Sequence, residues 1–149
     1  MWGTLKVRGT KEQLKDFILN GLGWVSANGV DARDVQLDRY GCIEYGYGYL
    51  SIKETRKCFV ENYSDVCLED FKEGETGVIL LDMETTYYIS GKQLQEISKQ
   101  YGIDLKICAF DKGMECGQDI EIVGGEIVKD DEITFADFLW ECPCPLLGG

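Results

Sequence analysis

Alternation of hydrophobic and polar residues predicts strands over residues 2–8, 78–83 and 103–110. The alternation is clearest in the last of these segments, where Ile103 and Leu105 would point to one side of a sheet and the polar residues between them to the other. The three segments lie far apart in the chain. We therefore expect a sheet that joins the two ends of the sequence.

Two segments with helical spacing of apolar residues each follow a predicted capping box. In residues 10–13 and 90–93, a hydroxyl residue is followed three positions later by glutamine, so that each side chain can bond the other residue's backbone amide. Apolar residues then recur at intervals of three and four. Gly21 and Gly102 follow these runs and are typical of helix ends. The sequence thus predicts one helix after each box.

A hairpin is predicted around Gly124 and Gly125. Ile120, Ile122 and Ile127 alternate with charged neighbours on both sides of this pair. A two-residue glycine turn adopts the positive φ values that tight antiparallel connections require. The segment would therefore extend the sheet at its C-terminal end.

The order of these elements favours a single α+β domain over residues 1–149. Strand, helix and strand, then strand, helix, strand and hairpin, are typical of a ferredoxin-like split βαβ sandwich with two helices on one face of an antiparallel sheet. One half would span residues 1–60 and the other residues 77–141. Residues 20–49 are weakly patterned and are expected to form long loops plus one strand. The exposed edge of such a sheet could also accept a second copy in a homodimer.

Length and composition are consistent with one domain outside the membrane. The chain has 149 residues, of which 44% are hydrophobic, enough for one core but short for two. No apolar run approaches the roughly 18 residues that cross a bilayer. Residues 1–6 lack the apolar stretch of a signal peptide. We therefore expect a cytoplasmic protein with no membrane contact.

Histidine is absent, which removes the commonest general base near neutral pH and the commonest metal ligand. The seven cysteines are odd in number and irregularly spaced, and are expected to be reduced thiols rather than a disulfide framework. Cys108, Cys116, Cys142 and Cys144 could surround zinc, but no Cys-x-x-Cys pair occurs, so thiols without metal are the favoured interpretation. We expect no cofactor.

Acidic residues concentrate at the C-terminal end. The chain carries a net charge of −12, and residues 110–149 hold ten acidic residues against two lysines. A dense negative surface speeds encounters with basic partners and can occupy a groove built for phosphate. We expect it to contact lysines and arginines of a nucleic-acid-binding protein and not to bind nucleic acid itself. The predicted contact residues are Glu115, Asp119, Glu121, Glu126, Asp130, Asp131, Glu132 and Asp137.

Tyr45, Tyr47 and Tyr49 alternate with glycines, and on a strand they would share one face. One interpretation is a stacking platform for a base or for a partner's side chain. The favoured interpretation is that the rings cover the sheet or a helix as part of the core.

Residues 89–133 contain a helix ending in Ser-Lys-x-Tyr, a strand, an acidic Gly-Met turn and a final hairpin. These positions are Ser98, Lys99, Tyr101, Gly113, Met114, Gly125, Glu126 and Ile127. The stretch resembles the C-terminal ferredoxin-like domain of YubB-type accessory proteins of phages, plasmids and conjugative elements. Residues 7–10, with Leu14 and Phe17, resemble the start of the same proteins. Residues 85–88 differ, since the family often has a tryptophan-containing turn there.

The resemblance implies a mobile-element accessory role without an established enzyme activity. Small acidic proteins of such elements commonly interfere with host defence, including CRISPR nucleases. We therefore expect a non-enzymatic inhibitor of the anti-CRISPR type, whose acidic surface competes with guide RNA or DNA on a Cas9-like effector. One alternative is an Mg²⁺-dependent nuclease or hydrolase acting on RNA through the carboxylates at 130–132, 137 and 141. Another is a regulatory or assembly protein of a conjugative element, with the tyrosines or Leu146 and Leu147 as its contact.

Overall fold

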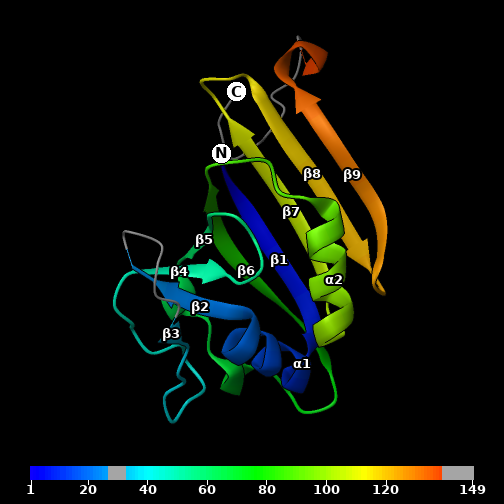
Figure 1. Cartoon of the computed structure of the whole chain (residues 1–149). Coiled ribbons are helices and arrows are strands. Elements are labelled where there is room, and N and C mark those ends of the chain that lie inside the picture. Colours follow the sequence, from blue (N-terminus) through cyan, green and yellow to red (C-terminus); the bar gives the residue numbers. More distant parts are fainter. Residues whose placement is uncertain (27–32, 139–149) are drawn as a thin grey trace.

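One nine-stranded sheet forms the body of the molecule. The structure is a computed structural model that describes residues 1–26 and 33–138. The strand order is β3-β2-β4-β5-β6-β1-β7-β8-β9, and each neighbouring pair is antiparallel (Figure 1). The strands are β1 (Trp2–Thr10), β2 (Leu22–Val25), β3 (Arg33–Asp34), β4 (Tyr49–Ile52), β5 (Cys58–Glu61), β6 (Thr76–Thr85), β7 (Asp104–Asp111), β8 (Cys116–Val123) and β9 (Glu126–Thr134).

Two short helices accompany the sheet. α1 (Lys11–Asp16) follows β1 directly and continues into a π-helical turn over Phe17–Gly21, and α2 (Gly91–Tyr101) connects β6 to β7. Single turns of 3-10 helix lie at Tyr63–Asp65, Leu68–Asp70 and Phe135–Phe138. None of the helices in the described ranges combines the length and the apolar character needed to cross a membrane.

Hydrogen bonds at the helix starts confirm one predicted capping box and not the other. Thr10 Oγ1 accepts a hydrogen bond from the Gln13 amide at 3.3 Å, and Gln13 Oε1 accepts one from the Thr10 amide at 2.8 Å. Ser90 occupies the N-cap of α2, but its side chain makes no capping hydrogen bond. The predicted ends are confirmed, since the first helical segment stops at Gly21 and Gly102 closes α2 with a left-handed φ of 65°.

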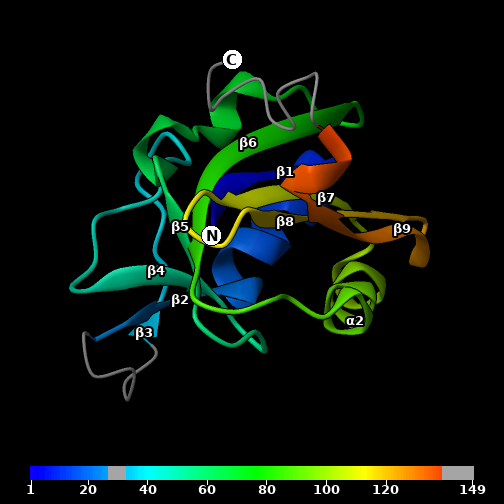
Figure 2. The ribbon, with the colours of Figure 1, turned by 90° about the horizontal axis from the view of Figure 1, so that it is seen from above.

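The core lies between the central strands and the two helices. Figure 2 shows α1 and α2 on the same side of β1, β7 and β8. Leu14, Phe17, Leu94 and Ile97 from the helical segments are almost fully buried. They pack in one cluster with the strand residues Leu5, Val7, Leu105, Ile107, Ile120 and Ile122. We call this side of the sheet the covered face. The alternate residues of the same strands form the open face, which includes Trp2, Lys6, Val78, Leu80, Glu84 and Lys106.

The ferredoxin-like prediction is wrong. A split βαβ unit leaves a single strand between the two strands that its helix connects, whereas α1 leads from β1 to β2, and β6, β5 and β4 lie between them. The sheet is also much larger than predicted, and the two helices are short. The molecule is therefore mostly antiparallel sheet, and the fold implied by the resemblance is not observed.

Residues 20–49 contain more strand than predicted, because β2, β3 and the start of β4 lie there. Each of these strands is only two to four residues long, too short for a clear alternation of hydrophobic and polar residues. Pairing with the neighbouring strands holds them in the sheet. Cys42 and Cys67, 25 positions apart, face each other in an isolated antiparallel bridge and form a disulfide. The prediction that the cysteines are all reduced thiols is therefore wrong.

Candidate partner-binding surface

The acidic arm consists of β8, β9 and the turn between them. Gly124 and Gly125 adopt φ values of 59° and 77°, which confirms the predicted glycine hairpin. The Gly124 amide donates a 2.8 Å hydrogen bond to Asp104 on β7, and Arg8 of β1 forms an ion pair with the same carboxylate at 2.7 Å. Burial alone would raise the pKa of Asp104, but these two partners lower it below its ordinary value. The turn is thereby fastened to the body of the sheet.

The predicted contact residues of the arm do not lie on one face. Asp130 and Glu132 are opposite Ile120 and Gln118, so they belong to the covered face beside α2. Asp119, Glu121 and Asp131 alternate with these positions and belong to the open face. The structure therefore places acidic side chains on both sides of the hairpin.

Several of these carboxylates already have a lysine partner. On the open face, Lys129 Nζ lies 2.6 Å from Asp119 and 3.8 Å from Asp131, and Lys106 lies 3.1 Å from Glu121. Hydrogen bonding to Asp119 raises the pKa of Lys129. The open side of the arm is thus partly neutralised, and its free negative charge is smaller than the sequence indicates.

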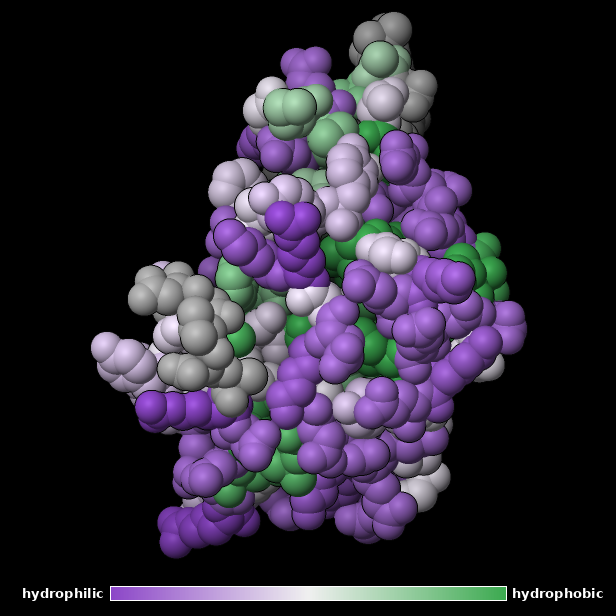
Figure 3. All heavy atoms as spheres, in the orientation of Figure 1, coloured by the Kyte–Doolittle hydropathy of each residue, from purple (hydrophilic) through white to green (hydrophobic). Residues whose placement is uncertain are grey.

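Asp130 and Glu132 on the covered side are exposed and form no ion pair with the described residues. Asp130 lies beside the N-terminus of α2, where a Cβ atom added to Gly91 would come within 2.2 Å of its carboxylate. The positive end of the helix dipole favours an acid at this place. A hollow of about 660 Å³ opens here, and Tyr88 and Gln118 also line it. Figure 3 shows mainly hydrophilic side chains on this side of the molecule.

The remaining predicted contact residues lie near the two ends of the arm. Glu126 is at the hairpin tip, where Lys99 of α2 reaches it at 3.4 Å. Glu115 precedes β8 at the other end, with a left-handed φ of 53°. The backbone of Asp137 lies in the 3-10 turn that begins at Phe135, whose amide donates to the Glu115 carbonyl at 2.9 Å.

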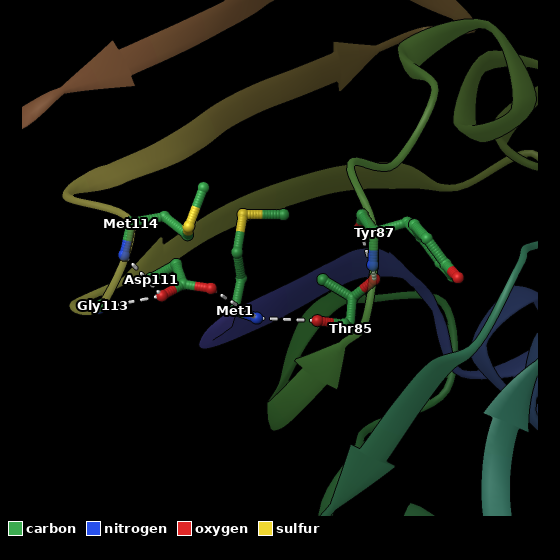
Figure 4. A network of polar contacts seen from close by, with 6 residues as sticks. All are labelled: Met1, Thr85, Tyr87, Asp111, Gly113 and Met114. Carbon is green, nitrogen blue, oxygen red and sulfur yellow. Dashed lines mark hydrogen bonds and ion pairs between the residues drawn. The ribbon is translucent and has the colours of Figure 1, made fainter.

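A small polar network holds the turn that contains Glu115 (Figure 4). Asp111 Oδ1 accepts hydrogen bonds from the amides of Gly113 at 2.9 Å and Met114 at 3.1 Å. The Met1 amino group lies 4.0 Å from the same carboxylate and donates a 2.7 Å hydrogen bond to the Thr85 carbonyl. The β7–β8 turn is therefore tied to the ends of β1 and β6.

Lys129 should contribute more to stability than Lys106, because their acidic partners are buried to different degrees. Asp119 keeps 18% side-chain exposure, and its Oδ1 is buried without a hydrogen-bond partner, whereas Glu121 keeps 35%. We expect Lys129→Met to lower the free energy of unfolding by about 1–2 kcal/mol by leaving a carboxylate largely desolvated and unpaired. The matched variant Lys106→Met should cost less than about 1 kcal/mol. Urea denaturation measures both, and equal losses would contradict the difference.

The three tyrosines do not form the predicted stripe. Only Tyr49 lies on a strand, while Tyr45 and Tyr47 belong to the loop before β4. Their exposed fractions are 78% for Tyr45, 79% for Tyr47 and 56% for Tyr49, so the interpretation that they are core residues is wrong. Tyr45 lies against Trp24 with ring centroids 6.0 Å apart, and Tyr49 lies against Phe59 at 5.5 Å. Tyr45 and Tyr49 thus take part in two separate aromatic contacts.

Of the possible zinc set, only Cys108 and Cys116 lie within the described residues. Cys108 and Cys116 lie three residues apart along the β7–β8 ladder, and Cys116 bonds Tyr88, which helps raise the pKa of that phenol to about 12. The predicted positions that lie outside the described residues are Glu141, Cys142, Cys144, Leu146 and Leu147. Among the described residues, no group of three or more cysteine or acidic side chains is placed to hold a metal ion. This includes Asp130, Asp131 and Glu132, which alternate between two faces.

The charge pattern along the chain does not reveal the pairing of lysines with part of the arm, and the exposed acids of β5 and β6 were not predicted as contact residues. The signal for the latter was the alternation of Glu61, Asp82 and Glu84 with buried neighbours. Comparison with known proteins adds no further assignment. No family model, curated protein or solved structure matches this chain.

Proposed function

We propose that this chain acts by binding, and that its acidic arm contacts a basic surface of a nucleic-acid-binding protein. The observation that carries the proposal is the place of β9 at the edge of the sheet, with acids on both sides. Asp130, Asp131 and Glu132 are consecutive and exposed, and β9 pairs only with β8 in the described part of the chain. An edge strand is accessible along its length, so a partner can reach both rows of carboxylates.

The chemistry of the covered side suits a cationic side chain in particular. Asp130 and Glu132 border the hollow beside α2, and no lysine of the described ranges is paired with either of them. Carboxylates without a counter-ion make a negative potential that attracts lysine and arginine and excludes phosphate. The arm would thus compete with nucleic acid for a protein surface rather than bind nucleic acid.

The target class that we propose is a host defence nuclease, with a Cas9-like effector as the first candidate. Such effectors hold guide RNA and DNA through lysine and arginine side chains. The resemblance of residues 89–133 to accessory proteins of mobile elements guides this choice of target. The proposal places the chain in the cytoplasm, where such an effector works.

Neutralising the three consecutive acids of β9 should weaken capture of the effector. We expect Asp130→Asn, Asp131→Asn and Glu132→Gln together to reduce affinity at least tenfold, roughly 1.4 kcal/mol or more, because charge pairs across an interface are lost. Affinity of the unaltered chain should also fall steeply with salt, since exposed charges are screened. Binding of the guide-free effector across a salt series measures both effects.

The matched control neutralises three exposed acids elsewhere, Glu44→Gln, Glu69→Gln and Glu96→Gln. Both triple variants remove the same charge from a chain of net −12. The control should bind nearly as well as the unaltered protein. Equal weakening by the two variants would show an effect of net charge alone, and undiminished binding by the arm variant would rule out the arm as the contact.

A further inference from the structure

A second hollow, away from the acidic arm, lies where β4 and β5 separate. Its volume is about 380 Å³, and its lining includes Tyr49, Phe59, Glu61, Tyr63 and Glu84. Three aromatic rings and two carboxylates thus surround one opening. Neither the arm nor the residues assigned to it take part.

The backbone explains why this hollow exists. β4 and β5 pair at only two positions, Leu50 with Val60 and Ser51 with Phe59. The ladder ends there: Tyr49 and Glu61, the next positions, are not paired with each other, although Tyr49 still pairs with Val25 on β2 and Glu61 with Asp82 on β6. The opening therefore lies where the β4–β5 ladder ends while each strand continues along its outer neighbour.

Two further contacts hold the separated strands in place. Gly48 has a φ of 110°, and a Cβ atom there would lie 2.1 Å from the Val25 carbonyl oxygen, so the chain can lie this close to β2 only as glycine. On the other side, Asn62 Oδ1 accepts a 2.7 Å hydrogen bond from the Asp82 amide, which holds the end of β5 against β6. The start of β4 is thus held against β2, and the end of β5 is held against β6.

The rings of the hollow are positioned by other rings. Tyr49 and Phe59 have centroids 5.5 Å apart, with planes at 48°. Tyr63 packs edge-on against the buried Trp24 at 5.0 Å. Such rings offer negative π faces to a cation, and a guanidinium group can stack on them.

The two carboxylates are unneutralised by the rest of the described chain. Glu61 and Glu84 are exposed and form no ion pair with any described lysine or arginine. They are diagonal neighbours on β5 and β6, a spacing of about 7–8 Å between Cα atoms on such a ladder. Asp82 lies directly opposite Glu61 and adds a third negative charge. Like charges placed directly opposite each other destabilise a sheet. A cation between them would reduce this repulsion.

We propose that this hollow binds the guanidinium group of an arginine side chain from a protein partner. Arginine fits better than lysine because its planar group can stack on Tyr49 or on Phe59 while its several N–H donors reach Glu61 and Glu84. Lysine offers a compact, strongly hydrated charge that gains less from the rings. No residue of the acidic arm lines this hollow, so arginine binding here is independent of partner binding by the arm.

N-acetyl-L-argininamide is the probe, titrated into the ¹⁵N-labelled full chain and followed by two-dimensional NMR. We expect saturable shifts at the amides of residues 48–50, 59–63 and 84. N-acetyl-L-lysinamide should bind at least about threefold more weakly, because it lacks the stacking plane. N-acetyl-L-citrullinamide, which has nearly the same shape without the charge, should give no saturable shift.

Variants distinguish binding in this hollow from non-specific attraction of the probe to the acidic protein. Glu61→Gln and Glu84→Gln should each weaken the probe at least about fivefold, since each removes a charged hydrogen-bond acceptor. Glu69→Gln, an exposed acid outside the hollow, should leave the affinity unchanged, as should the triple variant of β9. Any of three results would overturn the proposal: no saturable shift with the arginine probe, equal binding of the citrulline probe, or unchanged affinity in both glutamine variants.

Discussion

Replacing Phe17 with alanine should lower the free energy of unfolding by about 3–5 kcal/mol, the range for a large buried aromatic side chain. Phe17 is 1% exposed and is the first residue of the π-helical turn that follows α1. Its ring packs edge-on against Tyr101 of α2 with centroids 5.7 Å apart. A Cβ atom added to Gly21 would lie 2.6 Å from the same ring, so the ring is closely packed here against a glycine, which has no side chain to fill the cavity.

Urea denaturation followed by circular dichroism gives this loss directly. The control is Val78→Ala on the open face, where the side chain is 52% exposed and the expected loss is below about 1 kcal/mol. A loss of that small size for Phe17→Ala would contradict the packing between the first helical segment and α2. A marginally stable chain would lose much of its total stability, since domains are stable by only about 5–15 kcal/mol.

Breaking the Cys42–Cys67 disulfide should cost about 3.5 kcal/mol, the loop-closure value for residues 25 positions apart. The bond ties the segment before β4 to the 3-10 turn that starts at Leu68, in a part of the chain with few long strands. The same loss corresponds to a fall in Tm of roughly 7–14 °C for a domain of this size. Thermal unfolding with and without a reductant measures it.

The double variant Cys42→Ser and Cys67→Ser provides the control. It should unfold at the Tm of the reduced protein and should not respond to the reductant. An unaltered Tm on reduction of the parent chain would contradict a stabilising role of the bond.

Local signals predicted the elements that form locally. The Thr10 capping box and Gly21 located the first helical segment, and Gly124 and Gly125 located the hairpin. Each depends on hydrogen bonds or φ values within a few residues, which one sequence carries in full. The long alternating strand at residues 104–111 was found for the same reason.

The sheet order could not be predicted in this way. β2, β4 and β5 have only four residues each, too few for a clear alternation, and their pairing is set by neighbours distant in sequence. Their addition to β6 turned the expected small sheet into one of nine strands. The Cys42–Cys67 bond follows from the same long-range arrangement, and cysteine spacing alone does not reveal it.

For the acidic arm, composition predicted where the charge lies along the chain but not how it is used. Alternation on β9 places Asp131 on the opposite face from Asp130 and Glu132. Lys129 forms an ion pair with Asp119. Which face each of these acids takes, and the pairing of Lys129 with Asp119, depend on register and on the bulge between Glu121 and Ile122, which a pattern of charges does not show. The hollow between β4 and β5 depends on strand separation and was equally out of reach.

The most direct test of the central proposal is capture of a guide-free Cas9-type effector by the immobilised full chain, compared with capture of the same effector loaded with guide RNA. We expect near one-to-one capture of the guide-free effector, lost at high salt and lost when guide RNA is bound first. Capture that persists at high salt with guide RNA in place, or no capture at any salt, would contradict an acidic arm that competes with nucleic acid on this target.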